Sequence, residues 1–130
     1  MGGGPVQIHE GEFVRVRVPD RLERSLQLAL AEAHAPFFHH HEAGALEVVL
    51  REAEWARIAP RFAGAQMMPG FRLVSVHSGG ESAFPARLRR ALADDGVDAA
   101  LLPSFHNDHV LVRADQLERC LAVVRKLLSA

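Results

Sequence analysis

The sequence lacks several features that would each assign it to a class of proteins. Its 15 basic and 16 acidic residues leave a net charge of −1, which gives nucleic acid or an anionic membrane little to bind. Its one cysteine, Cys120, excludes an internal disulfide and fits a reducing compartment. No apolar run approaches the roughly 18 residues of a membrane helix, and residues 1–5 do not resemble a signal peptide. We therefore expect a soluble, cytoplasmic protein with no nucleic-acid or membrane partner.

The sequence is also short of catalytic and metal-binding motifs. It contains no cysteine pair, no H-E-x-x-H and no G-x-S-x-G. Among its eight histidines, His39 and His41 share a face of a predicted strand, and His106 and His109 flank Asp108. Strand histidines beside a carboxylate are a candidate zinc site, although exposed hairpin histidines are the simpler interpretation. We expect no metal and no cofactor.

What the sequence does contain is the same pattern twice. Ala29-Leu30-Ala31 recurs as Ala91-Leu92-Ala93, which is 62 positions later (91 − 29). The same spacing aligns Val48-Val49-Leu50-Arg51 with Val110-Leu111-Val112-Arg113. An internal repeat of this kind indicates one supersecondary unit used twice. The 130 residues suffice for two very small modules.

The first copy begins with a strand and a helix. Residues 13–18 alternate apolar and basic side chains, which predicts a half-buried strand whose inward-facing residues are Val14, Val16 and Val18. Asp20 lies three residues before Glu23, the spacing of a capping box at a helix start. Residues 1–10 are expected to be a loose lead-in.

The rest of the first copy predicts two strands and a short helix. The strands are expected at residues 36–41 and 46–50, and the helix at residues 53–59, with Trp55 packed on the sheet. Residues 63–70, rich in glycine and alanine, are the expected linker.

The second copy repeats the order β-α-β-β-α. The loop after its first strand is about four residues longer than the corresponding loop in the first copy. The predicted elements are a strand at residues 71–76, a helix ending near Gly96, strands at residues 97–102 and 109–113, and a last helix with a capping box at Asp115 and Glu118. The predicted fold is therefore α+β, with two ferredoxin-like βαββα modules in tandem at residues 11–65 and 70–130.

The second half carries a family resemblance. Its first strand (residues 71–76), the helix entry at Ser82-Ala83-Phe84 and the closing hairpin at residues 101–112 resemble an ACT domain. The two halves together resemble the tandem ACT arrangement of the CASTOR-like ACT proteins. The first half departs from the family pattern because it has Glu42-Ala43-Gly44 where the second half has Ser-Phe-His-Asn-Asp.

The resemblance implies a function as well as an ACT-like fold. ACT domains are regulatory modules that bind an amino acid or a similar effector. We therefore expect a non-enzymatic sensor or regulatory subunit that binds a small-molecule effector at the seam of its modules, forms a homodimer or other homo-oligomer, and acts on a regulated enzyme. The alternative is a protein-interaction or dimerisation module without a ligand, in which Arg15 and Arg17 would matter most. An enzyme that uses the histidines is a third reading.

The candidate ligand-binding residues all lie in the second half: His77, Gly79, Gly80, Ser82, Ser104, Asn107 and Asp108. A loop that enters a helix N-terminus offers backbone N–H groups to a carboxylate, and its glycines allow a close approach. The aspartate would pair with an amino group, while serine and asparagine would supply neutral hydrogen bonds. The same residue types are also ordinary loop and turn formers.

Overall fold

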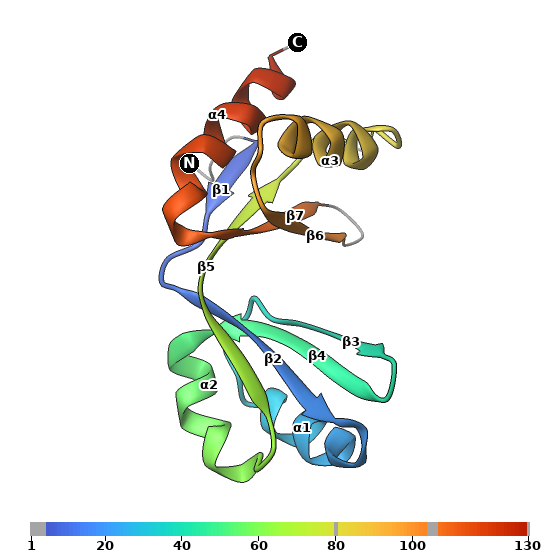
Figure 1. The fold of residues 1–130 in the computed structure, drawn as a ribbon, viewed down its shortest axis with the longest axis vertical. Helices are drawn as coiled ribbons and strands as arrows, with labels where there is room; N and C mark the ends of the chain where they lie inside the picture. Colours follow the sequence, from blue (N-terminus) through green and yellow to red (C-terminus); the bar gives the residue numbers. More distant parts are fainter. Residues whose placement is uncertain (1–4, 80, 104–106, 130) are drawn as a thin grey trace. The chain divides into compact units, whose positions relative to one another are not determined.

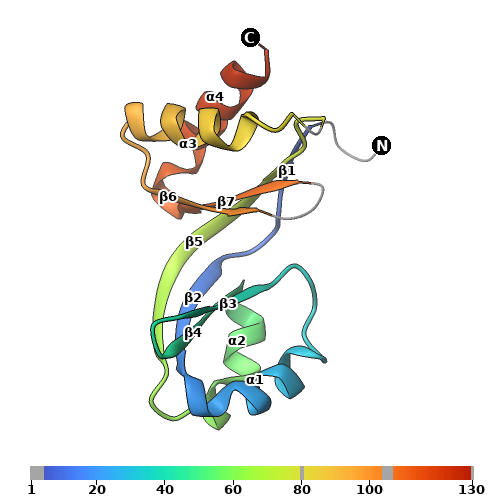
Figure 2. The ribbon, with the colours of Figure 1, turned by 90° about the vertical axis from the view of Figure 1, so that its right-hand side faces the viewer.

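The protein consists of two compact units. The computed structural model describes residues 5–79, 81–103 and 107–129. Unit 1 comprises Met1–Glu10 and Phe71–Ala130, and unit 2 comprises Gly11–Gly70. In each unit, two helices cover one face of an antiparallel sheet (Figures 1 and 2), which confirms the predicted α+β class and its ferredoxin-like repeat. Over the described residues, no helix combines the length and apolarity that crossing a membrane requires.

Unit 2 follows the predicted element order closely. Its sheet order is β3-β4-β2-β5. The elements are β2 (Phe13–Pro19), α1 (Glu23–Leu30), β3 (Phe38–Glu42), β4 (Ala45–Arg51), α2 (Glu52–Ile58) and the first part of β5 (Gln66–Val76).

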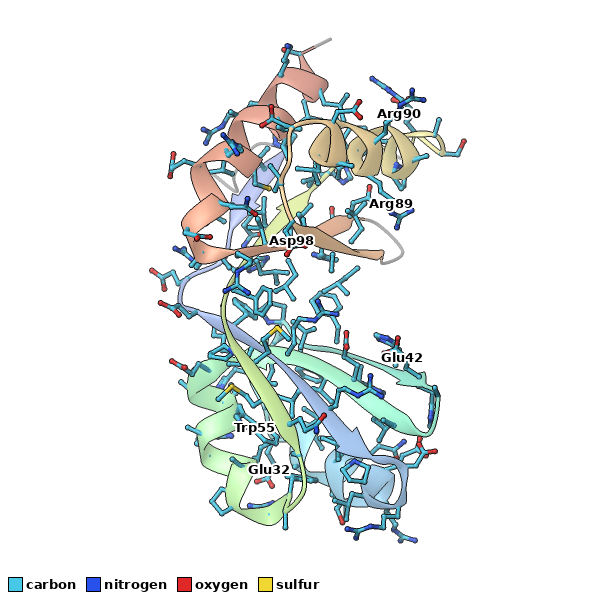
Figure 3. The ribbon with its side chains drawn as sticks, in the orientation of Figure 1. Glu32, Glu42, Trp55, Arg89, Arg90 and Asp98 are labelled. Carbon is cyan, nitrogen blue, oxygen red and sulfur yellow. The ribbon has the colours of Figure 1, made fainter. Side chains whose placement is uncertain are left out.

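The core of unit 2 confirms the predicted face of its first strand. Val14, Val16 and Val18 are each 0 % exposed and pack against both helices. Trp55 of α2 belongs to the same core, as predicted, and points from its helix toward the strands (Figure 3). The alternating pattern works because successive strand side chains point to opposite faces.

Unit 1 has the sheet order β1-β5-β7-β6. Its elements are β1 (Val6–Ile8), the second part of β5, α3 (Phe84–Asp94), β6 (Ala99–Pro103), β7 (Asp108–Arg113) and α4 (Leu117–Leu128). Gly96, predicted to end a helix, has φ +72° two residues after α3. Cys120 is 0 % exposed in this core, and burial raises the pKa of its thiol to about 11, so it is the small core residue that its place beside a leucine stripe suggests.

The expectation of a loose lead-in at residues 1–10 was wrong for residues 6–8, and residues 1–4 lie outside the described residues. Val6–Ile8 form β1, which pairs antiparallel with β5. Backbone bonds extend this pairing, because the His77 N–H donates to the Pro5 carbonyl at 2.7 Å and the His9 N–H to the Leu73 carbonyl at 3.0 Å. Three residues are too few for a readable period, and the strand forms because β5 offers it an edge.

The predicted linker was also wrong in its second part. Residues 66–70 are strand and belong to β5, which starts in unit 2 and ends in unit 1. Pro69 and Gly70 interrupt the alternation of side chains that would predict a strand there. Both residue types are nevertheless tolerated at a sheet edge.

Neither predicted capping box forms. Each helix is instead preceded by a 3₁₀ turn, Asp20–Leu22 before α1 and Ala114–Gln116 before α4, and neither helix has a side-chain cap. The backbone supplies the missing partner, because the Glu23 N–H donates to the Asp20 carbonyl and the Leu117 N–H to the Ala114 carbonyl.

The repeat extends to a pair of side-chain contacts. Phe13 lies directly opposite Arg51 in unit 2, and Phe71 lies directly opposite Arg113 in unit 1. The guanidinium carbon lies 5.3 Å from the ring centroid in the first pair and 5.6 Å in the second. Both distances fit a cation–π contact, so the two copies share packing detail as well as element order.

Candidate functional site

The candidate site lies in unit 1, where β5 ends and β7 begins. Asp108, the first residue of β7, lies opposite Val76, the last residue of β5. Just beyond the strands, Nδ1 of His77 donates a hydrogen bond to Oδ1 of Asn107 at 3.1 Å. Three of the predicted ligand-binding residues, His77, Asn107 and Asp108, are therefore brought together from segments about 30 residues apart.

The loop after β5 carries two more of the predicted residues. Gly79 has φ +80°, a left-handed conformation that favours glycine, with open space where a Cβ would point. Ser82 is exposed two residues before α3, whose N-cap residue, Ala83, makes no side-chain cap hydrogen bond. Gly80 and Ser104, the other two predicted residues, lie outside the described residues.

Asp108 is the unusual residue of this group. It was expected in a turn, but strand pairing makes it the start of β7. Strand alternation places it on the helix-covered face with Val110 and Val112. The residue is only 9 % exposed, and among the described residues no hydrogen bond or ion pair holds its carboxylate, whose oxygens still reach solvent. Burial raises the pKa of Asp108 because the charged form loses solvation.

A second polar cluster lies on the other face of the same strands. Ser75 is 6 % exposed, and its Oγ lies 2.7 Å from Nε2 of His9 and 2.6 Å from Nδ1 of His109. Burial lowers the pKa of His109, and the nearby His9 lowers it further. No pattern in the sequence predicts this cluster, because His9 and Ser75 meet only through the unpredicted pairing of β1 with β5.

The histidines do not gather around a metal position in the described part of the chain. No group of three or more His, Cys, Asp or Glu side chains there is placed to hold a metal ion. His41 is engaged by carboxylates, with Nε2 2.9 Å from Glu23 Oε2 and Nδ1 3.6 Å from Asp20 Oδ1. His106 lies outside the described residues.

These groups together suit a small zwitterionic ligand that carries an ammonium group and a carboxylate. The partly desolvated carboxylate of Asp108 is a partner for an ammonium group. The loop that contains Gly79 leads into α3, whose dipole favours a carboxylate near its N-terminus. Of its first two residues, Phe84 already donates its N–H to the Glu81 carbonyl at 3.2 Å and Pro85 has no N–H.

Comparison with known proteins identifies solved structures that have a similar fold. The sequence matches no protein-family model and no curated protein. The aspartate kinase of Clostridium acetobutylicum contains a similar structure (TM-score 0.77, 11 % identity), which covers 95 % of this chain and 34 % of that chain. This chain thus spans about a third of that enzyme.

Two solved chains of about this length are similar as well. The structure of aspartokinase alpha and beta subunits matches with a TM-score of 0.77 at 15 % identity, over 98 % of this chain and 99 % of that chain. The ligand-free regulatory subunit of aspartate kinase from Thermus thermophilus matches with a TM-score of 0.68 at 18 % identity, over 95 % and 97 %. These likenesses confirm an ACT-type fold of two ferredoxin-like modules. Membership of the CASTOR-like group stays a prediction.

Proposed function

We propose that this protein is a non-enzymatic regulatory sensor that binds a small effector, an amino acid, in unit 1. The effector's ammonium group pairs with Asp108, and its carboxylate lies against the loop with Gly79, Gly80 and Ser82. His77, Ser104 and Asn107 supply the neutral hydrogen bonds. The regulated partner is an enzyme, and the protein acts as a homo-oligomer.

The observation that carries the proposal is the partly desolvated carboxylate of Asp108. The residue is 9 % exposed, and the loss of solvation raises the pKa of its carboxyl group. Among the described residues the carboxylate has no hydrogen bond or ion pair that compensates for this loss. The ionised form of Asp108 therefore lowers the stability of the ligand-free protein. A ligand ammonium would supply the missing partner at a point where the surrounding low dielectric strengthens the pair.

The similar structures support the regulatory part of the proposal. Two of them are described as regulatory subunits of aspartate kinase, from Thermus thermophilus and Thermus flavus. A third is described as a putative C-terminal regulatory domain of aspartate kinase. Because a fold can host different functions, the effector itself has to be identified by binding.

The test is a thermal-shift screen of the full chain against the twenty amino acids, followed by titration calorimetry of any that bind. Asp108→Asn should weaken binding by roughly tenfold to a hundredfold, the loss expected for a charge-assisted hydrogen bond. Asp98→Asn is the matched control, since Asp98 is an exposed aspartate of the same unit (Figure 3), and it should leave binding unchanged.

Two results would contradict the proposal. One is the absence of any thermal shift or heat with all twenty amino acids, which would favour the protein-interaction reading. The other is equal binding by wild type and Asp108→Asn. Asp108→Asn removes a buried charge and should not unfold the protein, so a loss of binding can be assigned to the site.

A further inference from the structure

A groove in unit 2 lies on the face of its sheet that the helices leave uncovered. Its volume is about 300 Å³, and it is lined by Arg15, Arg17, Glu47, Gln66, Met67 and Met68. The two arginines alternate along β2 with the buried valines, so they point away from α1 and α2. We call this the β2–β5 groove. Its volume is at the lower end of the range for small-molecule sites.

The polar side of the β2–β5 groove carries three charged side chains, two arginines and one glutamate. A second glutamate, Glu42, lies near Arg17, so the positive charge of Arg17 faces a ligand fully only when the ligand displaces Glu42. Nη2 of Arg15 donates to Oε1 of Glu47 at 2.9 Å, and that glutamate is 12 % exposed. The Arg15–Glu47 ion pair is close and partly shielded from solvent, so it is a rigid part of the groove lining.

Arg17 is held much more loosely. Its Nη1 lies 3.8 Å from Oε2 of Glu42, and the two side chains are 47 % and 51 % exposed. Glu42 projects from β3 on the same uncovered face (Figure 3). An exposed ion pair at this distance contributes little, so a ligand carboxylate can replace Glu42 as the partner of Arg17 at small cost. A planar guanidinium also binds a carboxylate through two N–H groups.

Two consecutive methionines of β5 line the groove, and strand alternation places the side chain of one of them on the face of Arg17. Met67 and Met68 are 44 % and 51 % exposed, among the few large apolar side chains that reach the surface. They lie on the first part of β5, which in unit 2 pairs with β2. Unbranched methionine side chains adapt to ligands of different shape, and exposed apolar side chains beside a charged group are typical of binding sites.

We propose that the β2–β5 groove binds a small monocarboxylate that carries an apolar chain. The carboxylate pairs with Arg17, and the chain packs on the methionine of β5 whose side chain shares the face of Arg17. This site is separate from the proposed effector site, since its lining lies wholly in unit 2. It does not rest on the proposed function, and each site can be tested with the other intact.

The experiment uses the methionines themselves as probes. The chain has three methionines, so a full-length sample with ¹³C-labelled methionine methyl groups gives a simple NMR spectrum. The probe ligand is 4-methylpentanoate. Its saturable binding should shift the methyl signal of the methionine on the face of Arg17 more than that of the other strand methionine, and leave the signal of Met1 in place. The uncharged 4-methylpentanamide should bind roughly tenfold or more weakly, and acetate, which lacks the chain, should bind at least as weakly.

Three variants make the assignment specific. Arg17→Gln should weaken 4-methylpentanoate binding roughly tenfold or more. Glu47→Gln should strengthen it, because the lining gains net positive charge. Arg21→Gln, at an exposed arginine of the same unit, is the matched control and should change nothing.

The proposal is overturned by any of three results. These are no saturable methyl shift up to about 10 mM ligand, equal binding of acid and amide, or wild-type binding by Arg17→Gln. Because the Arg17 and Glu47 variants are expected to act in opposite directions, misfolding of one cannot imitate the predicted pattern. Asp108→Asn should leave this titration unchanged, which separates it from the effector site.

Discussion

Helix α1 offers a matched pair of substitutions that tests which of its faces is buried. Leu26 is 1 % exposed and belongs to the core of unit 2, whereas Leu28, two residues later, is 65 % exposed. The same change to alanine at both positions removes the same atoms from the same helix. The helical period alone therefore decides which substitution lowers stability.

The expected magnitudes follow from these exposures. Leu→Ala at the buried position loses about 2.4 kcal/mol of transfer free energy, at about 0.8 kcal/mol per carbon removed. The cavity left behind raises the loss to about 2.7–5.0 kcal/mol. At Leu28 about a third of the side chain is buried, so the loss is about 0.8 kcal/mol, reduced by a few tenths because alanine favours helix.

The assay is urea unfolding followed by tryptophan fluorescence. Trp55 is the only tryptophan of the chain and lies in the same core as Leu26, so it reports on the unit that carries both substitutions. The difference in free energy of unfolding between the two variants should be about 2 kcal/mol or more. The reasoning is refuted if Leu26→Ala loses less than about 1 kcal/mol, or if both variants lose the same amount.

Three further predictions concern titratable groups of unit 1. Asp108→Asn should raise the free energy of unfolding at neutral pH. The pKa of Asp108 is raised in the folded protein, so wild type loses stability as the pH rises from the ordinary value of 3.8 through the folded value. A gain that persisted at pH 3 in urea titrations would contradict this. His109→Gln should make the decrease of stability below pH 6.5 less steep. The pKa of His109 is lowered in the folded protein, so on acidification the unfolded chain binds a proton at His109 before the folded protein does. Parallel profiles of stability against pH for the two proteins would count against this. Cys120 should react slowly with Ellman's reagent in the native protein and quickly in denaturant, since its thiol is buried with a pKa of about 11; rapid native labelling would show that the thiol is accessible.

The candidate site was only partly readable from the sequence. His77, Asn107 and Asp108 were selected for their residue types beside predicted strand ends, and the structure brings them together. The burial of Asp108 could not be predicted, because Asn-Asp is a common turn pair and only strand pairing places it on the core face. The cluster around Ser75 was missed entirely, since one of its members lies 66 residues away in the chain.

The sequence by itself determined the local structure and its repetition. Period-two and helical patterns specify which face of a strand or helix is apolar, and the same pattern appears twice. Only the tertiary structure decided which strands pair. Val6–Ile8 joins the unit whose other strands lie beyond residue 70, and β5 serves both units. Pairing depends on free backbone N–H and C=O groups at a distant strand edge, and nothing in the local pattern of a short strand records where that edge lies.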